Sequence, residues 1–231
     1  MTTNAPIKTL FLDIGGVLLT NGWDHLVRRR AAKHFHLEWA ELEGRHGLNF
    51  TTFEEGKITL DVYLDRVVFH RKRLFTREQF RRFMFTQSAP CSGMIELATR
   101  LKIQHRLKLV VVSNEARELN AYRIRHFKLD ALVDAFVSSC FVGVRKPDAD
   151  IFRLALDIAQ TPTRQIVYIE NTELFVQIAE GMGISSILHT DYKSTRARLA
   201  ALGLHDDQAI VPKAIRTPAD NRSGKTGATN H

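Results

Sequence analysis

The stretch that decides the fold is KTLFLDIGGVLLT, at residues 8–20. Its first part is a short apolar run that ends at the carboxylate of Asp13, and a glycine pair, Gly15 and Gly16, follows almost directly. A short apolar run bounded by turn-forming residues is typical of a buried β-strand. We therefore expect a strand over residues 8–13, with Asp13 at its carboxyl end.

Four further runs of this kind follow along the chain. They are KLVVV at residues 108–112, a weaker run at 135–138, IVYI at 166–169, and a short run at 186–188. Helical patterns separate them, at residues 94–102, 116–127, 148–159, 173–181 and 195–202. Apolar strands that alternate with helices favour a parallel sheet covered on both faces. The sequence thus predicts an α/β fold with a Rossmann-like parallel sheet.

The connection between the first two strands is unusually long. It contains helical periodicity at residues 25–36, 60–68 and 77–86, with Thr76 and Gln79 placed as a capping box, and no convincing strand. A crossover needs only one helix, so we expect an inserted all-helical cap. The predicted division is a core over residues 1–18 and 89–204, a cap over 19–88, and a polar, disordered tail over 205–231.

Charge and composition narrow the class of protein. The formal net charge is +8, and its two basic clusters, around Arg28 and between Arg71 and Arg82, both fall in the expected cap. We interpret them as a solvated basic face, with a funnel for anionic substrates as the alternative. Nucleic-acid binding ranks third, since no recognised nucleic-acid-binding module accompanies the charge. The oligomeric state, monomer or homodimer, stays open.

Cysteine usage and hydropathy bear on the compartment. No apolar run approaches the roughly 20 residues that span a membrane. The two cysteines, Cys91 and Cys140, have no metal-like spacing, and nothing requires a disulfide between them, although one stays open. We expect a cytoplasmic protein without a membrane partner.

Polar residues end three of the expected strands. Asp13 ends the first, Ser113 and Asn114 follow the second, and Glu170 and Asn171 follow the fourth. Lys146, in a Lys-Pro pair, opens the helix before the fourth strand. Ligands of open parallel sheets bind beyond the carboxyl ends of the strands, so these groups should surround one anion-sized space.

At this point residues 8–204 resemble the haloacid-dehalogenase-like (HAD) superfamily. The motifs that carry the resemblance are LDIGGVLLT (12–20), VVVSNE (110–115), RKPDADIF (145–152) and VYIENTELF (167–175), followed by AEGMGI (179–184). DIGGVL and RKPD are most similar to the helical-cap phosphatase branch, which includes the N-terminal domain of soluble epoxide hydrolase and the sugar-phosphate phosphatases. The place of the inserted cap is the same in that branch.

The resemblance implies roles for individual residues. Asp13 would attack a small phosphorylated substrate and form an aspartyl-phosphate, with Ser113 and Lys146 as the other catalytic residues. Ser113, Asn114, Lys146 and Gly16 would bind the phosphoryl group. The metal site for Mg²⁺ would comprise Asp13, the Gly15 carbonyl, and Glu170 or Asn171 from the fourth motif.

Two positions depart from the phosphatase pattern. The acid–base aspartate that normally stands two residues after the nucleophile is replaced by Gly15, and such a loss typically costs roughly 10²–10⁴ in rate. The second acid of the fourth motif is replaced by Asn171, which supplies an oxygen but no charge, so Mg²⁺ should be held weakly. If the fourth motif aligns with the family pattern one residue earlier, Glu170 is itself the Mg²⁺ ligand.

These departures leave three functional readings. The preferred one is a weak or specialised phosphatase. The alternatives are a HAD-fold binding or regulatory protein without catalysis, and an Mg²⁺-independent haloacid dehalogenase; the aromatic residue usual in the first motif of dehalogenases is absent, because Gly15 stands there. The cap histidines, including His46, are interpreted as surface or packing residues, and Trp23 as a packing residue that could line the mouth of the site.

Overall fold

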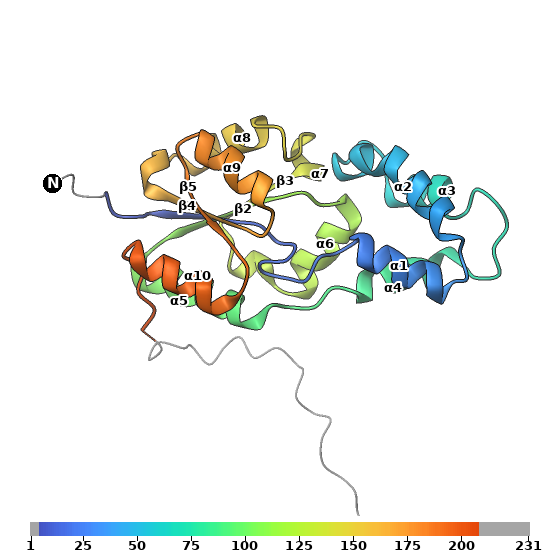
Figure 1. Ribbon diagram of the computed structural model, residues 1–231, viewed down its shortest axis with the longest axis horizontal. Coiled ribbons are helices and arrows are strands. Elements are labelled where there is room, and N and C mark those ends of the chain that lie inside the picture. Colours follow the sequence, from blue (N-terminus) through green and yellow to red (C-terminus); the bar gives the residue numbers. More distant parts are fainter. Residues whose placement is uncertain (1–4, 208–231) are drawn as a thin grey trace, which may run out of the picture.

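The structure, a computed structural model, describes residues 5–207. Its core is a five-stranded parallel sheet in the order β3-β2-β1-β4-β5 (Figure 1). The strands are β1 (Thr9–Leu12), β2 (Lys108–Ser113), β3 (Ala135–Ser138), β4 (Ile166–Glu170) and β5 (Ser185–Leu188). All five were expected from the apolar runs, and the α/β fold with a parallel sheet is confirmed.

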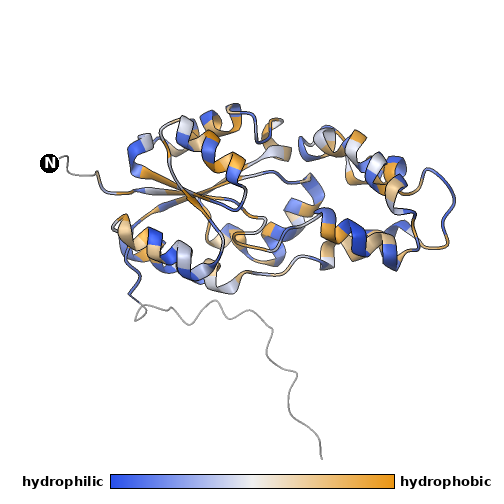
Figure 2. Cartoon of the chain, in the orientation of Figure 1, coloured by the Kyte–Doolittle hydropathy of each residue, from blue (hydrophilic) through white to orange (hydrophobic). Residues whose placement is uncertain are grey.

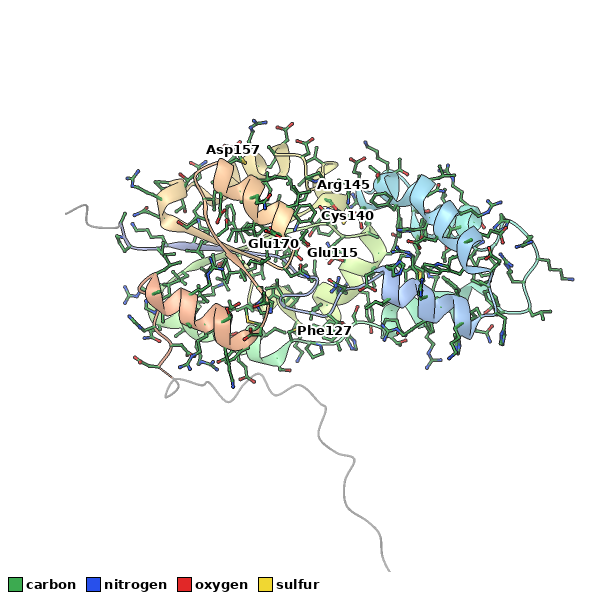
Figure 3. The ribbon with its side chains drawn as sticks, viewed as in Figure 1. Glu115, Phe127, Cys140, Arg145, Asp157 and Glu170 are labelled. Atoms are coloured by element: carbon green, nitrogen blue, oxygen red, sulfur yellow. The ribbon has the colours of Figure 1, made fainter. Side chains whose placement is uncertain are left out.

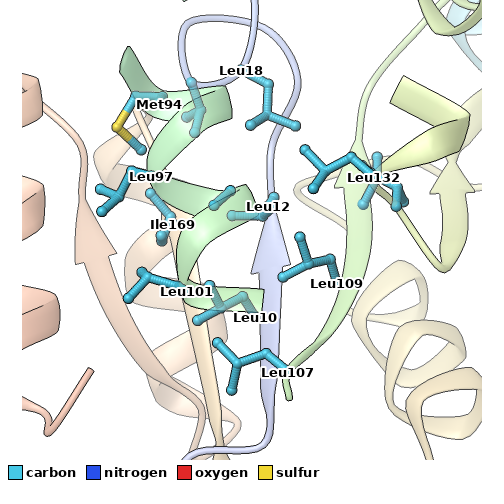
Figure 4. Close-up of a cluster of buried hydrophobic side chains, with 14 of the residues drawn as sticks. Leu10, Leu12, Leu18, Met94, Leu97, Leu101, Leu107, Leu109, Leu132 and Ile169 are labelled. Carbon is cyan, nitrogen blue, oxygen red and sulfur yellow. The ribbon is translucent and has the colours of Figure 1, made fainter. Parts of the chain in front are cut away.

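Helices cover both faces of the sheet. Leu10 and Leu12 of β1 point to one face, where they pack with α5 (Ser92–His105) and α10 (Tyr192–Ala201), and Phe11 points to the other, toward α8 (Asp150–Ala159) and α9 (Glu173–Gly181). Figure 4 shows the first of these clusters, and Figure 2 shows that the strands are the most apolar part of the core. Because both faces are buried, the strands read as continuous apolar runs. The remaining core elements are α6 (Arg117–His126), α7 (Ser139–Val142) and two 3₁₀ turns at Leu129–Ala131 and Thr163–Gln165.

The register of the sheet places Asp13 at its centre. Leu12 lies opposite Val111 of β2 on one side and Ile169 of β4 on the other. The next residue, Asp13, therefore emerges level with the carboxyl ends of both neighbouring strands. The strand order reverses between β1 and β4, and such switch points are where open parallel sheets bind ligands.

The insertion between β1 and β2 is entirely helical. It contains α1 (His25–His34), α2 (Trp39–Glu54), α3 (Leu60–Val67) and α4 (Arg77–Thr86), which pack around a hydrophobic core of their own (Figure 1). Three of these helices and the capping box between Thr76 and Gln79 were predicted. The sequence analysis missed α2, which carries Gly44 and Gly47 in its interior and buries only Leu42 and Phe53.

The two segments that join the helical insertion to the sheet are hydrogen-bonded to each other. The N–H of Thr20 donates to the carbonyl of Ala89 at 2.9 Å, and the N–H of Ala89 donates to the Thr20 hydroxyl at 3.0 Å. One step closer to the sheet, the N–H of Cys91 donates to the carbonyl of Leu18 at 2.9 Å. The chain therefore leaves the core and returns to it side by side.

The cysteines, the start of the tail and the length of the helices can be compared with the expectations from the sequence. Both Cys91 and Cys140 are free thiols. In the expected tail, the side chain of Asp206 is 1% exposed and forms ion pairs with Arg100 and Arg196, while residues 208–231 lie outside the described residues. None of the described helices has the length and apolar character needed to cross a membrane.

Candidate active site

A cavity of about 390 Å³ lies between the carboxyl end of the sheet and the helical insertion. Glu115 and Glu170 lie at this end of the sheet in Figure 3. The sheet domain and the helical insertion both contribute residues to the wall of this cavity. The core supplies Asp13, Gly15, Asn114, Glu115, Ala116, Arg123, Lys146, Glu170, Asn171, Thr172 and Phe175, and the insertion with its linker supplies Asn21, Gly22, Trp23, Asp24, Arg28, His46, Phe50, Phe53 and Glu54.

Lys146 is the fully buried cation at the base of this cavity. Its Nζ lies 2.8 Å from Asp13 Oδ1, 2.5 Å from Glu170 Oε2, 3.0 Å from the Tyr168 hydroxyl and 3.1 Å from the carbonyl of Val112. Burial opposes the charge, but the carboxylates of Asp13 and Glu170 together raise the pKa of Lys146 above its usual value. The side chain is therefore an ammonium group that binds two carboxylates at once.

Asp13 directly follows β1 and lines the cavity. Its Oδ1 accepts the hydrogen bond from Lys146. Burial raises the pKa of Asp13 to about 6, although the Lys146 ammonium and a hydrogen bond from Ser113 favour the ionised form. Ser113 itself is 1% exposed and does not line the cavity. Its hydroxyl thus lies against Asp13, and the expected contact between Ser113 and substrate stays a prediction.

Asn114 holds the backbone of Lys146. Its Nδ2 donates to the Lys146 carbonyl at 2.8 Å, and its Oδ1 accepts from the Lys146 N–H, also at 2.8 Å. The sequence analysis expected this side chain to contact substrate. In the structure both ends of the amide are engaged with the peptide groups of Lys146 and fix the position of the lysine, and the expected contact with substrate stays a prediction.

Both oxygens of Glu170 are already hydrogen-bonded. Oε2 accepts from Lys146 and from the Tyr168 hydroxyl, and Oε1 accepts from the backbone N–H groups of Asn171 and Thr172, each at 2.9 Å. The side chain is 1% exposed. A metal ion could reach Glu170 only by displacing some of these partners, so Asn171 is the more accessible of the two expected metal ligands.

The Asn171 amide faces two oxygens, Glu170 Oε1 and the Gly15 carbonyl, and its two orientations have different consequences. With Oδ1 turned toward them, the amide and the Gly15 carbonyl present two oxygens to a small cation, while Glu170 Oε1 keeps its two backbone hydrogen bonds. With the amide turned over, Nδ2 donates to Glu170 Oε1 at 2.9 Å and to the Gly15 carbonyl at 3.2 Å. The residues therefore fit Mg²⁺, but they also satisfy one another without it.

Gly16 has a positive φ of 76°, and its N–H donates to the Leu19 carbonyl at 2.6 Å. A Cβ on this residue would lie 2.1 Å from Asn171 Nδ2. Because the Gly16 N–H is already bonded to Leu19 in the same loop, Gly16 determines the shape of the loop below the cavity. The expected contact between Gly16 and substrate therefore stays a prediction.

We expect Gly16→Ala to lower the free energy of unfolding by about 1–3 kcal/mol, because a left-handed backbone and a displaced Asn171 both disfavour a side chain here. Urea denaturation measures the loss. The matched control is Gly15→Ala, whose Cβ would meet Asn21 Oδ1 at 3.1 Å and whose φ lies outside the left-handed region. An equal decrease in the free energy of unfolding in the two variants would contradict the specific requirement for glycine at residue 16.

A second buried ion pair joins the cavity to the linker. Arg123 donates to Glu115 Oε1 and, through its other terminal nitrogen, to the Thr20 carbonyl at 2.6 Å. The Arg123 and Glu115 side chains are 1% and 4% exposed. Burial raises the pKa of Glu115 even though Arg123 opposes the rise. Arg123 therefore connects the end of the sheet at which Asp13 lies to the base of the helical insertion.

A family model of haloacid dehalogenase-like hydrolases matches residues 7–183. The chain belongs to this family. No curated protein sequence matches it at a significant level.

Solved structures with the same fold support the architecture of this HAD-like hydrolase. A HAD family enzyme from Bacteroides thetaiotaomicron, solved with magnesium and inorganic phosphate, is 19% identical with a TM-score of 0.66, over 78% of this chain and 93% of its own. A Porphyromonas gingivalis protein described as a predicted HAD-like family hydrolase is 17% identical with a TM-score of 0.67, over 85% and 98%. An L-2-haloacid dehalogenase is 16% identical with a TM-score of 0.58, over 78% and 85%. At these identities the likeness concerns the fold.

The HAD-like hydrolase brings Asp13, Ser113, Lys146, Glu170 and Asn171 together as the strand ends suggested. The sequence analysis overlooked one residue that does contact Lys146. The Tyr168 hydroxyl lies against both Lys146 and Glu170. Its position two residues before Glu170 in a strand places it on the same face, and this alternation was the available signal.

Proposed function

We propose that the protein is a phosphatase that hydrolyses small phosphate monoesters with Asp13 as the nucleophile. The observation that carries the proposal is the contact between Lys146 Nζ and Asp13 Oδ1 at 2.8 Å, at the wall of a cavity closed by the cap. The ammonium keeps the carboxylate ionised and offers positive charge to an incoming phosphoryl group. The B. thetaiotaomicron relative solved with magnesium and inorganic phosphate is consistent with this reaction class.

The reaction has two steps. An Asp13 oxygen attacks phosphorus and forms an O–P bond, while the bond from phosphorus to the ester oxygen breaks and its electron pair stays on the leaving group. Water then attacks the phosphorus of the aspartyl-phosphate, which releases inorganic phosphate and regenerates the Asp13 carboxylate, while the proton of the water passes to solvent. Ser113 and Lys146 orient the nucleophile, and Asn114 positions the lysine.

The metal ligands we assign are Asp13, the Gly15 carbonyl and Asn171. Bound Mg²⁺ would supply charge that offsets the negative phosphoryl oxygens. This set contains a single carboxylate, and no cluster of three acidic, histidine or cysteine ligands occurs within residues 5–207. We therefore assign weak metal binding, with Glu170 as the anchor of Lys146.

Asn171→Asp is expected to tighten Mg²⁺ binding at least about tenfold, because a second carboxylate raises the charge of the ligand set. Isothermal titration of the full chain with MgCl₂ measures the change. Asn171→Leu is the control, since it removes the side-chain oxygen and should weaken binding. An affinity that is the same in all three proteins would rule out Asn171 as a ligand.

A second candidate is an Mg²⁺-independent dehalogenase. The observation in its favour is that Asn171, in one orientation, satisfies Glu170 and the Gly15 carbonyl without a cation. Asp13 would attack the carbon that bears the halogen, a C–O bond would form, and the halide would leave with the bonding electron pair. Such a leaving group needs no proton, so Gly15 is compatible with this reaction.

A panel of phosphate esters and 2-haloacids, assayed with MgCl₂ and with EDTA, separates the candidates. Release of inorganic phosphate that increases with MgCl₂ is the expected result. Halide release in EDTA, without turnover of any phosphate ester, would replace the phosphatase with the dehalogenase. If neither product forms, the remaining candidate is a binding or regulatory protein without catalysis.

A further inference from the structure

Three aromatic residues and a histidine contribute to the cap side of the cavity, together with Asp24, Arg28 and Glu54, whose charged groups are already hydrogen-bonded within the protein. Trp23, Phe50, Phe53 and His46 all line it, and Phe175 adds a fourth aromatic ring from the core. The cap therefore offers flat apolar surfaces and one imidazole to whatever is attached to the phosphoryl group. The sequence analysis interpreted His46 as a surface or packing residue, but the cavity and its hydrogen bonds indicate a more specific role.

A hydrogen-bond relay determines which nitrogen of His46 carries the proton. Trp23 Nε1 donates to the Tyr63 hydroxyl at 2.8 Å, and the same hydroxyl lies 2.8 Å from His46 Nδ1. An indole N–H can only donate, so the Tyr63 oxygen accepts from Trp23. Tyr63 is completely buried, and within the described residues His46 Nδ1 is the one acceptor left for its hydroxyl hydrogen.

It follows that Nδ1 accepts and that the ring proton is on Nε2. Burial, reinforced by the nearby Arg28 guanidinium and opposed by Glu43, lowers the pKa of His46 to about 4, so the imidazole is neutral at physiological pH. Nε2 has no hydrogen-bond partner in the part of the chain that the structure describes. A neutral N–H donor of fixed orientation is therefore available at the cavity wall.

We propose that His46 Nε2–H is the cap group that hydrogen-bonds the leaving-group oxygen, and that the preferred substrates are aryl phosphates. This inference rests on the proposed phosphatase activity. When the P–O bond breaks, the electron pair stays on the aryl oxygen, which accepts the hydrogen bond from Nε2–H without receiving its proton. The phenolate takes a proton from solvent after release.

The identity of residue 15 supports this class of substrate. Gly15 cannot protonate a leaving oxygen, so an ester whose leaving group is stable as an anion suits the site best. Aryl oxygens meet that requirement, and aryl rings match the four aromatic side chains of the wall. The volume of about 390 Å³ lies within the range of small-molecule pockets.

The test compares aryl phosphates of graded leaving-group acidity with glycerol phosphate. We expect the wild type to prefer the aryl esters. His46→Phe keeps an aromatic ring but removes the donor, and should lower kcat/KM on the order of 10- to 100-fold, the size of a hydrogen bond to a charged oxygen. The loss should be largest for the least acidic phenols, so the dependence on leaving-group pKa becomes steeper. His46→Gln, which retains an N–H donor, should restore most of the rate.

Two further proteins make the test specific. His34→Phe is the matched control, because His34 stacks on Phe83 at 5.2 Å and lies outside this cavity. Tyr63→Phe breaks the relay, so NMR of the histidine rings should show protonation of Nε2 alone in the wild type and a mixture of the two tautomers in the variant.

The outcomes distinguish the inference from the proposed function. If the wild type hydrolyses phosphate esters and His46→Phe has the same rates and the same leaving-group dependence, the role of His46 is wrong while the phosphatase assignment stands. A wild-type imidazole protonated on Nδ1 would also overturn it. If the wild type hydrolyses no phosphate ester, both the proposed function and this inference fail.

Discussion

Asp13→Asn is expected to abolish phosphate release, with a loss on the order of 10⁴–10⁶-fold, as is usual when a covalent nucleophile is removed. The amide has nearly the shape of the carboxylate, and its oxygen can still accept the hydrogen bond from Lys146, but it cannot form a stable bond to phosphorus. Mass spectrometry of enzyme quenched with acid during turnover should find a phosphorylated chain in the wild type and none in the variant.

Asp24→Asn is the matched control for this experiment. Asp24 lines the same cavity, but its carboxylate accepts from the N–H of Val27 at 2.8 Å and caps α1. Asparagine is an equally good cap, so the folded protein and most of the activity should be retained. Phosphate release that survives in Asp13→Asn would exclude Asp13 as the nucleophile.

Lys146→Met should lower both stability and activity. Methionine fills a similar volume, but the change leaves the carboxylates of Asp13 and Glu170 buried without their cation. Removal of one partner from a buried ion pair typically costs about 3–5 kcal/mol. Asp13 should then also prefer its protonated form, so the nucleophile is lost at neutral pH.

The stability loss should depend on pH in a defined direction. Without Lys146, burial holds the folded-state pKa of Asp13 still further above its unfolded value, so this group binds more protons in the folded variant than in the unfolded chain. The stability of the variant must therefore fall as the pH rises, and urea denaturation should show a greater loss at pH 8 than at pH 5.

The comparison for Lys146→Met is Lys102→Met. Lys102 pairs with Asp134 at 2.7 Å, and its side chain is 28% exposed, so its loss should cost less than about 1 kcal/mol. A free energy of unfolding for Lys146→Met within about 1 kcal/mol of the wild type would contradict the central role of the lysine.

Strand ends were the most predictable part of the site. In a sheet buried on both faces, apolar runs mark the strands, and parallel pairing brings their carboxyl ends to one edge. Asp13, Ser113 and Glu170 could therefore be assigned to one place before any coordinates. Lys146 could be grouped with them by the order of the four motifs along the chain, but its role came from the resemblance to a family, because nothing in its own stretch of sequence indicates that its side chain reaches across to the first strand.

The functions of the polar side chains were less predictable than their positions. The sequence places Asn114 and Glu170 at strand ends, but only the packing of the loops determines that one holds the backbone of Lys146 and the other its ammonium group. The role of His46 depends on Tyr63 and Trp23, which lie 17 and 40 positions from their partners in the relay. Contacts of that kind leave no local pattern.

Helix α2 was not predicted from the sequence, for a different reason. Its two interior glycines and its threonines disfavour a helix, and its few buried side chains give no clear periodicity. The helix forms because Glu38 caps its first turn and because Leu42 and Phe53 pack into the core of the cap. Tertiary packing thus outweighs a weak local preference, and this helix carries His46, Phe50 and Phe53.

The hydrogen bonds between Thr20 and Ala89 hold the two ends of the helical insertion next to each other. Its two ends meet at one point beside the sheet, so a segment of different length or shape can be grafted there without moving a strand. Asp13 and Lys146 lie outside such a graft, whereas Trp23, His46 and Phe50 travel with it. Under the proposed function, the residues of the reaction and those that contact the leaving group are therefore encoded in separate portions of one gene, so each set can diversify while the other is preserved.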